Sequence, residues 1–282
     1  MENSSGNGKV VVVLPAYNAA KTLMHTLAEV PPEYGQHIIL VDDCSRDETV
    51  ELAHTAGLRV LQHKRNLGYG ANQKTCYWAA LTAGADIVVM LHPDHQYDGS
   101  MIPRLVAPIQ EGEAEAVFGS RMLGGRPLEG GMPRWKYVAN VFLTAAANIV
   151  FGRYLTEIHS GFRAYSRHYL ETVRFEENSD DFVFDTEIIA QGMACNLRFF
   201  EVPIVTRYFP EASSINFRRS LVYGFGVLRV LLRYALHKAG RRNCRQFKPK
   251  VPRDRGTLDT RHALGASMPE ESYAGMSKTG VA

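Results

Sequence analysis

The stretch Val10-Val11-Val12-Val13-Leu14-Pro15-Ala16-Tyr17-Asn18 places five apolar residues directly before a polar loop. An apolar run of this length that ends at turn residues predicts a buried strand. Four runs of the same kind follow it, namely His37–Val41, Leu58–Gln62, Ile87–Leu91 and Ala116–Gly119. They alternate with segments of helical period near Ala20–Val30, Thr49–Ala56 and Ala71–Ala83. This alternation predicts an α/β fold with a mostly parallel sheet, covered by helices on both faces.

Polar clusters come directly after the first four predicted strands. They are Pro15 to Asn18, Asp42 with Asp43, Asn66 to Gly70, and His92 to Gln96. Ligands of parallel α/β sheets bind outside the carboxyl ends of the strands, where the connecting loops gather. We therefore expect these four loops to share one rim of a ligand site.

The loop from His92 to Gln96 is dense in metal-capable side chains. Asp94 and Gln96 stand two residues apart at a strand end and can face the same cation, and hard divalent ions prefer such oxygen ligands together with substrate phosphates. Such an ion would neutralise the charge on a departing diphosphate. Two other interpretations stay open: a turn whose polar residues face water, and a zinc site of His92, Asp94 and His95. Zinc is disfavoured because no cysteine or further histidine lies nearby.

Asp42 and Asp43 end the second predicted strand. Acids at this place accept hydrogen bonds from nucleotides in other α/β folds, but they equally suit a helix N-terminus, whose dipole favours negative charge. The segment Ser45-Arg46-Asp47-Glu48 has the form of a capping box, which predicts that a helix begins there. Gly68-Tyr69-Gly70, with Lys74 after it, allows phosphate to approach the backbone, but it matches neither common glycine-rich phosphate motif.

The second half of the chain changes character. A glycine-rich connection from Gly124 to Gly131 leads into a long helical pattern from about Trp135 to Phe151, and a short strand is predicted over Leu197–Val202. We expect one catalytic domain over residues 9–210. Residues 1–8 and 246–282 are polar and lack helix or strand periodicity, so we expect them to be flexible ends.

Residues 211–245 are predicted to form a basic amphipathic segment. Between Arg207 and Lys250 there are eleven Lys or Arg residues and one acid, so residues 1–206 are net negative in a chain whose total charge is +3. Apolar residues from Asn216 to Ala239 follow helical spacing, while Arg229 and Arg233 interrupt any run long enough to span a bilayer. We expect the segment to lie on an anionic membrane surface or to pack on a second copy as a homo-oligomer. Few aromatic residues are arranged for base stacking, so no nucleic-acid partner is expected.

The predicted location follows from the cysteines and the N-terminus. The four cysteines form no C-x-x-C pair, which indicates reduced thiols rather than a disulfide framework. The first residues have neither the basic start nor the apolar run of a secretory signal. We expect a cytoplasmic protein, peripheral at the inner face of the membrane.

Eight segments between Val10 and about Ile204 carry a family resemblance: VVVLPAYNAAKTL, VDDCSRDET, NLGYGANQ, VVMLHPDHQYD, FGSRMLGG, SGFRAYSR, DFVFDTEI and LRFFEVPI. In this order they resemble glycosyltransferase family 2, and more closely its branch similar to dolichyl- or polyprenyl-phosphate sugar synthases. The resemblance implies a GT-A fold and Mg²⁺ or Mn²⁺ as cofactor. It also implies an inverting transfer from a UDP- or GDP-sugar to a polyprenyl or dolichyl phosphate.

The resemblance also implies site residues. The nucleotide would be bound by Pro15, Ala16, Tyr17, Asn18, Asp42, Asp43, Asn66 and Gly70. The metal would be bound by Asp94 and Gln96. Such synthases usually read Asp-x-Asp-x-Gln here, and His92 replaces the first acid. Either His92 is a ligand, or the ion relies on Asp94, Gln96 and the diphosphate.

A second departure concerns the acceptor. Arg121 in Gly-Ser-Arg resembles the arginine that holds the acceptor phosphate in such synthases. The second arginine, expected in the following helix, is replaced near Asn140. Arg134, Lys136 and Arg163 are the candidates to compensate for it.

Two kinds of acceptor predict two mechanisms. A lipid phosphate is already anionic and needs no base, so positioning by Arg121 and Arg163 would suffice. A sugar or protein hydroxyl needs a general base, for which Asp185 is the candidate. Both residues also fit structural roles, Asp185 as a helix cap and Arg163 as the partner of a buried acid. A third hypothesis, a non-catalytic nucleotide-sugar binder, rests on His92.

Overall fold

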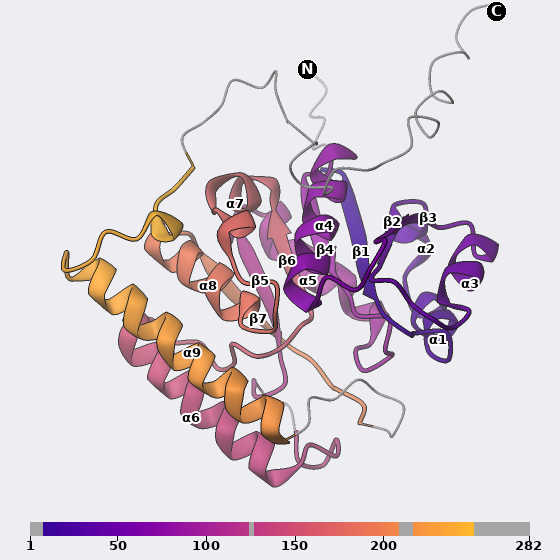
Figure 1. The fold of residues 1–282 in the computed structure, drawn as a ribbon. Coiled ribbons are helices and arrows are strands. Elements are labelled where there is room, and N and C mark those ends of the chain that lie inside the picture. Colours follow the sequence, from indigo (N-terminus) through magenta and orange to yellow (C-terminus); the bar gives the residue numbers. More distant parts are fainter. Residues whose placement is uncertain (1–7, 124–126, 209–216, 251–282) are drawn as a thin grey trace, which may run out of the picture.

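The computed structural model describes residues 8–123, 127–208 and 217–250 (Figure 1). Most of the two predicted flexible ends lies outside the described residues, namely residues 1–7 and 251–282. The same is true of residues 211–216 of the predicted basic segment.

The described strands form one seven-stranded sheet in the order β3-β2-β1-β4-β6-β5-β7. Their bounds are β1 Val10–Ala16, β2 Ile38–Asp42, β3 Arg59–Gln62, β4 Ile87–Met90, β5 Ala116–Ser120, β6 Arg163–Ser166 and β7 Phe199–Pro203. Strand β1 pairs in parallel with β2 and β4, β2 with β3, and β5 with β7. Strand β6 runs antiparallel between β4 and β5. The prediction of a mostly parallel sheet is confirmed, and β6 is an unpredicted antiparallel insertion.

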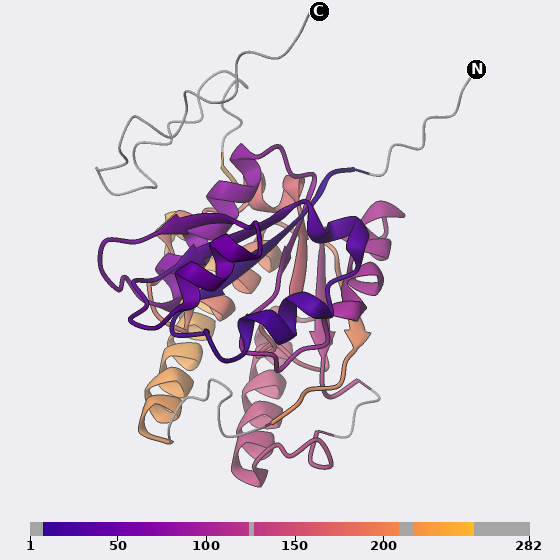
Figure 2. The same ribbon diagram turned by 90° about the vertical axis from the view of Figure 1, so that its right-hand side faces the viewer.

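Helices cover both faces of the sheet (Figures 1 and 2). They are α1 Leu23–Ala28, α2 Pro32–Gly35, α3 Thr49–Thr55, α4 Tyr69–Thr82, α5 Ile102–Gln110, α6 Arg134–Phe151, α7 Arg167–Thr172, α8 Phe184–Ala194 and α9 Phe217–Lys238, with short 3-10 turns at Gly99–Met101, Phe175–Glu177 and Arg245–Phe247. Alternate residues of β1 face opposite sides: Val11 and Val13 belong to the core that includes residues of α4, α6, α8 and α9, whereas Val12 and Leu14 belong to the core that includes residues of α1, α3 and α5. Because both faces are covered, the strand is apolar throughout.

The predicted capping box does not form. Helix α3 begins at Thr49, and its N-cap residue Glu48 makes no side-chain capping bond. Ser45 instead accepts a hydrogen bond from the backbone N–H of Asn18 at 2.8 Å, and Asp47 accepts one from the N–H of Thr49 at 3.1 Å. The serine thus joins two loops of the rim rather than starting a helix.

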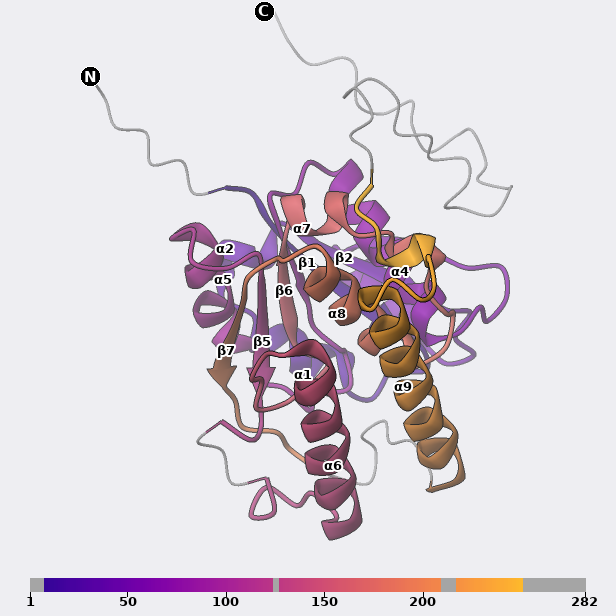
Figure 3. The same cartoon turned by 90° about the vertical axis from the view of Figure 1, so that its left-hand side faces the viewer.

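Helix α9 is an integral part of the domain rather than an appendage. Val227, Val230, Leu231 and Tyr234 are buried in the same core as the sheet. Helices α6 and α9 pack against one another and extend past the sheet, as Figures 1 and 3 show. No helix within the described ranges combines the length and apolar character needed to cross a bilayer.

The prediction that a flexible tail begins at residue 246 is wrong for its first five residues. Phe247 is buried beside α9, and Gln246 donates hydrogen bonds to the side chains of Asn178 and Glu187. Lys250 lies over the ring of Phe175. These long-range contacts carry no local periodicity, so the sequence did not reveal them.

Candidate active site

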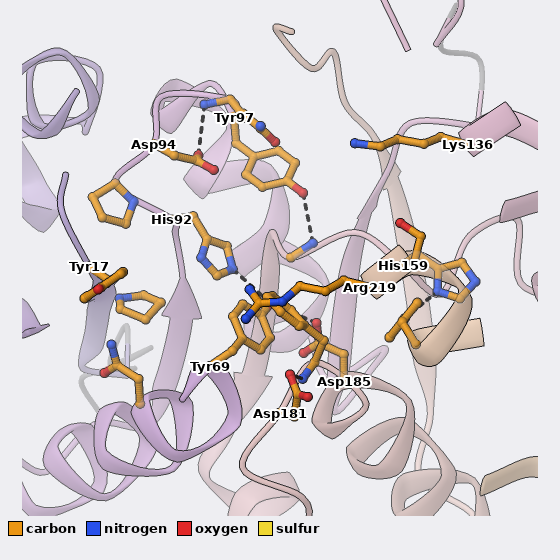
Figure 4. Close-up of a pocket in the computed structure, with 18 of the residues that line it drawn as sticks. Tyr17, Tyr69, His92, Asp94, Tyr97, Lys136, His159, Asp181, Asp185 and Arg219 are labelled. Atoms are coloured by element: carbon orange, nitrogen blue, oxygen red, sulfur yellow. Dashed lines mark hydrogen bonds between the residues drawn. The ribbon is translucent and has the colours of Figure 1, made fainter. Parts of the chain in front are cut away.

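A cavity of about 750 Å³ opens where the loops after β1 to β4 meet the helices of the second half (Figure 4). Its lining from the first half includes Pro15, Ala16, Tyr17, Asn18, Asp43, Asn66, Tyr69, His92, Asp94 and Gln96. Its lining from the second half includes Arg121, Trp135, Lys136, Asn140, His159, Asp185, Arg219 and Tyr223. The predicted rim therefore forms, and three predicted residues, Asp42, Gly70 and Arg163, are not among the described residues that line the cavity.

The loops after β1 and β2 are tied together at the edge of the cavity. The side-chain oxygen of Asn18 accepts a hydrogen bond from the N–H of Arg46 at 2.9 Å, which adds to the bond between Asn18 and Ser45. Asn18 has φ 52°, in the left-handed region that asparagine tolerates better than most residues. Tyr17 beside it is 50% exposed, so its ring is available to a ligand.

The two acids after β2 have different surroundings. The Asp43 carboxylate accepts hydrogen bonds from the N–H groups of Leu67 and Gly68 and contacts His63 Nδ1 at 2.8 Å, so it holds the loop after β3. Asp42 is fully buried behind the cavity wall, contrary to the expected contact position. Its Oδ2 accepts from Ser45 N–H, and its Oδ1 has no hydrogen-bond partner among the described residues.

Gly70 serves backbone packing and is not among the described residues that line the cavity. A Cβ at this position would collide with the carbonyl oxygen of Ser179. Its N–H donates to the carbonyl of Asp180 at 2.8 Å, which fixes the start of α4 against the segment before α8. Asn66, which does line the cavity, donates to the carbonyl of Asp43 at 3.2 Å.

The predicted metal ligands separate into two groups. Asp94 accepts a hydrogen bond from the N–H of Gln96 at 3.2 Å, and burial raises the pKa of its carboxyl above the ordinary value. His92 points elsewhere: its Nε2 lies 3.4 Å from the hydroxyl of Tyr69, the two rings stack, and burial lowers the pKa of its imidazole. Figure 4 shows His92 directed toward Tyr69. The described residues contain no cluster of three or more His, Cys, Asp or Glu that would hold a metal, so the zinc alternative has no site there.

Asp185 is held by three donors. Its carboxylate accepts hydrogen bonds from Tyr69 Oη at 2.9 Å and Gln73 Nε2 at 3.0 Å, and Arg163 Nη1 lies 3.2 Å from it. It lies in the first turn of α8 without capping the helix. Arg163 is almost completely buried and also donates to the carbonyls of Ser160 and Ile158, so it supports Asp185 from behind the cavity lining. Burial opposes its charge, but Asp185 outweighs this and raises the pKa of Arg163 well above normal.

Arg121 is paired with a buried acid that the sequence did not single out. Its Nε donates to Glu157 at 2.8 Å, its Nη2 forms an ion pair with the same carboxylate, and its Nη1 donates to Tyr208 at 3.0 Å. Asn140, in place of the expected second arginine, donates to Glu157 at 2.7 Å. Burial alone would raise the pKa of Glu157, but Arg121 outweighs it and lowers that pKa.

Further cationic side chains of α6 and α9 line the same cavity. Of the three candidates to replace the second arginine, Lys136 lines the cavity, whereas Arg134 is exposed outside it and Arg163 is buried behind it. Burial and the neighbouring Arg121 lower the pKa of Lys136. Arg219, which sequence reasoning missed as a site residue, reaches into the cavity from α9 (Figure 4). Its only sequence signal is membership of the basic segment.

The glycosyl transferase family 2 model matches residues 11–174. The chain is 26% identical over 216 residues to a UDP-N-acetylglucosamine–dolichyl-phosphate N-acetylglucosaminyltransferase of Methanococcus voltae, covering 71% of this chain and 86% of that protein. It is 26% identical over 206 residues to an undecaprenyl-phosphate mannosyltransferase of Micrococcus luteus, covering 70% and 82%. The solved glucosyl-3-phosphoglycerate synthase of Mycobacterium tuberculosis, in complex with Mn²⁺, UDP and phosphoglyceric acid, is similar with a TM-score of 0.62 at 21% identity, covering 82% and 80%.

Proposed function

Because this chain belongs to glycosyl transferase family 2, we propose that its cavity transfers a sugar, with inversion, from a UDP- or GDP-sugar to a polyprenyl or dolichyl phosphate. The sequence-based predictions of the family, of the GT-A fold and of a glycosyltransferase enzyme are confirmed. The identity of the donor, the metal dependence, the acceptor and the membrane surface are parts of the proposal.

The observation that carries the phosphate acceptor is the set of basic side chains on the α6 and α9 side of the cavity. Arg121, Lys136 and Arg219 line it together. Cationic and hydrogen-bonding groups of this kind bind and orient an anionic phosphate. The named relatives from Methanococcus voltae and Micrococcus luteus, which act on dolichyl and undecaprenyl phosphate, support the same acceptor class.

The surroundings of Asp185 further favour an acceptor that needs no base. A general base must receive a proton from the attacking hydroxyl. The Asp185 carboxylate already accepts from Tyr69 and Gln73 and pairs with Arg163. A phosphate oxygen carries its own negative charge, so it attacks the anomeric carbon without transferring a proton to the protein.

Asp94 and Gln96 are the residues that would hold a divalent ion. Burial raises the pKa of Asp94, so its ionised form is disfavoured until a cation neutralises it, which fits a metal ligand. When bound, the ion supplies Lewis-acid stabilisation of the leaving diphosphate. His92 supports the loop by stacking on Tyr69. At the nucleoside end, Tyr17 offers an exposed ring.

The membrane surface is proposed for the outer face of α6 and α9. Helix α9 is apolar on two sides: its inner residues pack in the core, whereas Val222, Phe225 and Leu232 are 70%, 71% and 60% exposed. Phe142 and Ile149 of α6 are also exposed, at 62% and 82%. A surface helix of a water-soluble domain normally turns polar residues outward, so an apolar outer face beside basic residues suits an anionic lipid surface. The proposed location is therefore peripheral at a membrane, with a second copy of the chain as the competing occupant of this face.

Vesicle sedimentation tests the surface. The full chain is expected to bind vesicles containing anionic lipid at low salt. Phe225→Ser is expected to weaken binding, while Met24→Ser, at an exposed apolar site of α1 on the opposite face of the sheet, should leave it unchanged. Equal binding by both variants, or a stable dimer without vesicle binding, would exclude the lipid surface.

Incubation with UDP- and GDP-sugars, Mn²⁺ and farnesyl phosphate tests the chemistry. We expect a sugar-phosphate-prenyl product from one nucleotide class, with the anomeric configuration inverted in its NMR spectrum and the reaction stopped by EDTA. A retained configuration, or no product from any donor, would overturn the proposal.

A further inference from the structure

Glu201 is a carboxylate at the edge of the sheet that belongs to none of the roles described so far. It lies on β7, the last strand in the order of the sheet, and its Cα partner on β5 is Phe118. Glu201 is not among the described residues that line the cavity. Arg121, which is proposed to bind the acceptor phosphate, directly follows the end of β5. The turn that contains Thr156 and Glu157 connects the two residues.

The carboxylate of Glu201 holds this turn through three donors. Its two oxygens accept from the N–H of Thr156 at 3.0 and 2.8 Å. Oε1 also accepts from the Thr156 hydroxyl at 2.7 Å and from the N–H of Glu157 at 3.0 Å. Hydrogen bonds to an ionised carboxylate are stronger than those between neutral groups. One side chain of an edge strand therefore fixes two successive residues of the turn.

From Thr156, the connection continues to the backbone on both sides of Arg121. Because the Thr156 hydroxyl gives its proton to the carboxylate, it can only accept from the hydroxyl of Ser120, whose oxygen lies 2.6 Å away. The Ser120 oxygen in turn accepts from the N–H groups of Met122 and Leu123 at 3.2 and 3.1 Å. The carboxylate thus orients a chain of hydroxyls that holds the residues before and after Arg121.

From Glu157, the connection reaches Arg121 itself. The Glu157 carboxylate accepts from the backbone N–H of Arg121 at 2.7 Å and forms the ion pair with its guanidinium. The N–H of Glu157 is in turn bound by Glu201, so the position of the counter-charge depends on the edge strand. Glu201 therefore supports both the backbone and the side chain of Arg121, although its hydrogen bonds go to other residues.

We propose that Glu201 is a positioning residue for the acceptor phosphate, which acts on Arg121 through Thr156 and Glu157. The inference rests on the proposed function and extends it, because Arg121 is proposed there to bind the phosphate. A guanidinium binds a phosphate through hydrogen bonds of fixed geometry. A misplacement of about 1 Å in a group that orients a substrate can lower a rate by about 10²-fold. Loss of the Glu201 carboxylate should therefore weaken acceptor binding from outside the cavity.

Kinetics of the full-length chain with farnesyl phosphate test the role. Glu201→Met keeps the length of the side chain and removes both acceptor oxygens, so it is expected to raise the acceptor KM by about tenfold and to leave the donor KM near wild type. Glu201→Gln keeps one acceptor oxygen and should recover most of the loss.

Glu115→Met is the matched control. Glu115 also accepts a backbone N–H between the same two strands, from Arg198 at 2.6 Å, but it lies at the start of β5 and β7, at the end remote from Arg121. This variant should change neither the acceptor KM nor the donor KM.

A second pair of variants separates positioning from folding. Thr156→Val preserves the shape of the side chain and removes the hydroxyl that joins Glu201 to Ser120, so it is expected to raise the acceptor KM by about threefold. Thr156→Ser keeps the hydroxyl and should stay near wild type. A lower melting temperature with an unchanged acceptor KM in both Glu201→Met and Thr156→Val would overturn the inference and leave the proposed function standing.

The variant Arg121→Lys shows whether Glu201 acts through the arginine. It keeps a cation beside Glu157 and removes the planar fork that binds phosphate. In this background Glu201→Met is expected to raise the acceptor KM by less than about threefold, because residues of one network are not additive. The same rise in both backgrounds would show that Glu201 acts by another route and would overturn the inference. Failure of the wild type itself to use farnesyl phosphate would overturn the proposed function and the inference together.

Discussion

The two sides of the cavity are built differently. On the proposed donor side, formed by the loops after β1 to β4, each loop follows its own parallel strand, and the lining residues lie between Pro15 and Tyr97. On the proposed acceptor side, the lining comes from Arg121 after β5, the loop before β6 and the helices α6, α8 and α9, and its residues are held by pairs distant in sequence. The comparison teaches that loops after parallel strands place the residues that line a cavity in short local motifs. The wall around the antiparallel strand and the later helices depends instead on contacts between residues distant in sequence.

The charges differ in the same way. The donor side presents the acids Asp43 and Asp94, which suit a cation and a nucleoside. The acceptor side presents Arg121, Lys136 and Arg219, and the charge of Arg121 is balanced by the buried Glu157. Changes on the donor side should therefore affect chemistry and donor binding, and changes on the acceptor side should affect stability and acceptor binding.

Removing the buried carboxylate of the acceptor side should have the largest effect. Glu157→Gln is expected to lower the free energy of unfolding by about 3–5 kcal/mol, because it leaves Arg121 buried without a counter-charge. Urea denaturation measures this loss. The matched control is Glu115→Gln, which breaks the pair with Arg198, whose side chain is 55% exposed, and should cost less than about 1 kcal/mol. Equal losses in the two variants would show that the pair of Arg121 and Glu157 stabilises this wall no more than an exposed ion pair does.

The corresponding change on the donor side should affect turnover and spare stability. Asp94→Ala is expected to lower kcat by about 10²–10³-fold, the usual effect of losing one group that stabilises developing charge. The melting temperature should stay the same or rise, since burial raises the pKa of this carboxyl and disfavours its charge. Asp98→Ala, which removes a hydrogen bond to the N–H of Ser100 in the same loop, is the control and should retain most activity. A large loss of stability in Asp94→Ala would contradict the division between the two sides.

Two cations of the acceptor wall should change one kinetic constant selectively. Lys136→Ala and Arg219→Ala are each expected to raise the acceptor KM by about tenfold, as expected for one charge-assisted hydrogen bond, with the donor KM unchanged. Arg134→Ala, an exposed residue of α6 outside the cavity, should leave both constants unchanged. If the donor KM rises instead, these cations bind the nucleotide, and the assignment of the two sides is wrong.

The smallest expected effect is a pH dependence of stability. The pKa of His159 is about 4 in the folded protein and 6.5 in a free histidine, so between these values the unfolded chain binds more protons. Stability should therefore fall as the pH drops from 6.5 toward 4, and His159→Gln should remove that part of the fall. Thermal unfolding of both proteins at pH 7 and pH 5 checks this. A wild type that loses no more stability than the variant would show that His159 is not buried in its neutral form.

The sequence predicted the strands β1 to β4 and the loops after them well because their signals are local. The apolar run from Val10 and the loop from His92 to Gln96 lie where expected. Two errors there have specific causes. The hydroxyl of Ser45 bonds to the neighbouring loop rather than to α3, and the small size of Gly70 is needed for Ser179 rather than for phosphate.

The acceptor side could be predicted only in outline. Strand β6 escaped notice because Arg163-Ala-Tyr-Ser lacks an apolar run, and it is stabilised by its two neighbours in the sheet. The substitution at Asn140 was visible, but its partner Glu157 was not, because seventeen residues separate them in the chain. Arg219 and Tyr223 belong to α9. The amphipathic pattern of this helix predicts that it has an apolar face and a polar face, but it does not predict which side chains enter a cavity.

The most direct test of a phosphate-binding acceptor wall compares farnesyl phosphate with farnesol as acceptors for the same protein, donor and Mn²⁺, with products followed by mass spectrometry. We predict rapid transfer to farnesyl phosphate and none above background to farnesol. Transfer to farnesol at a similar rate, or to a saccharide hydroxyl in preference to the phosphate, would contradict the proposal that the acceptor brings its own anionic nucleophile.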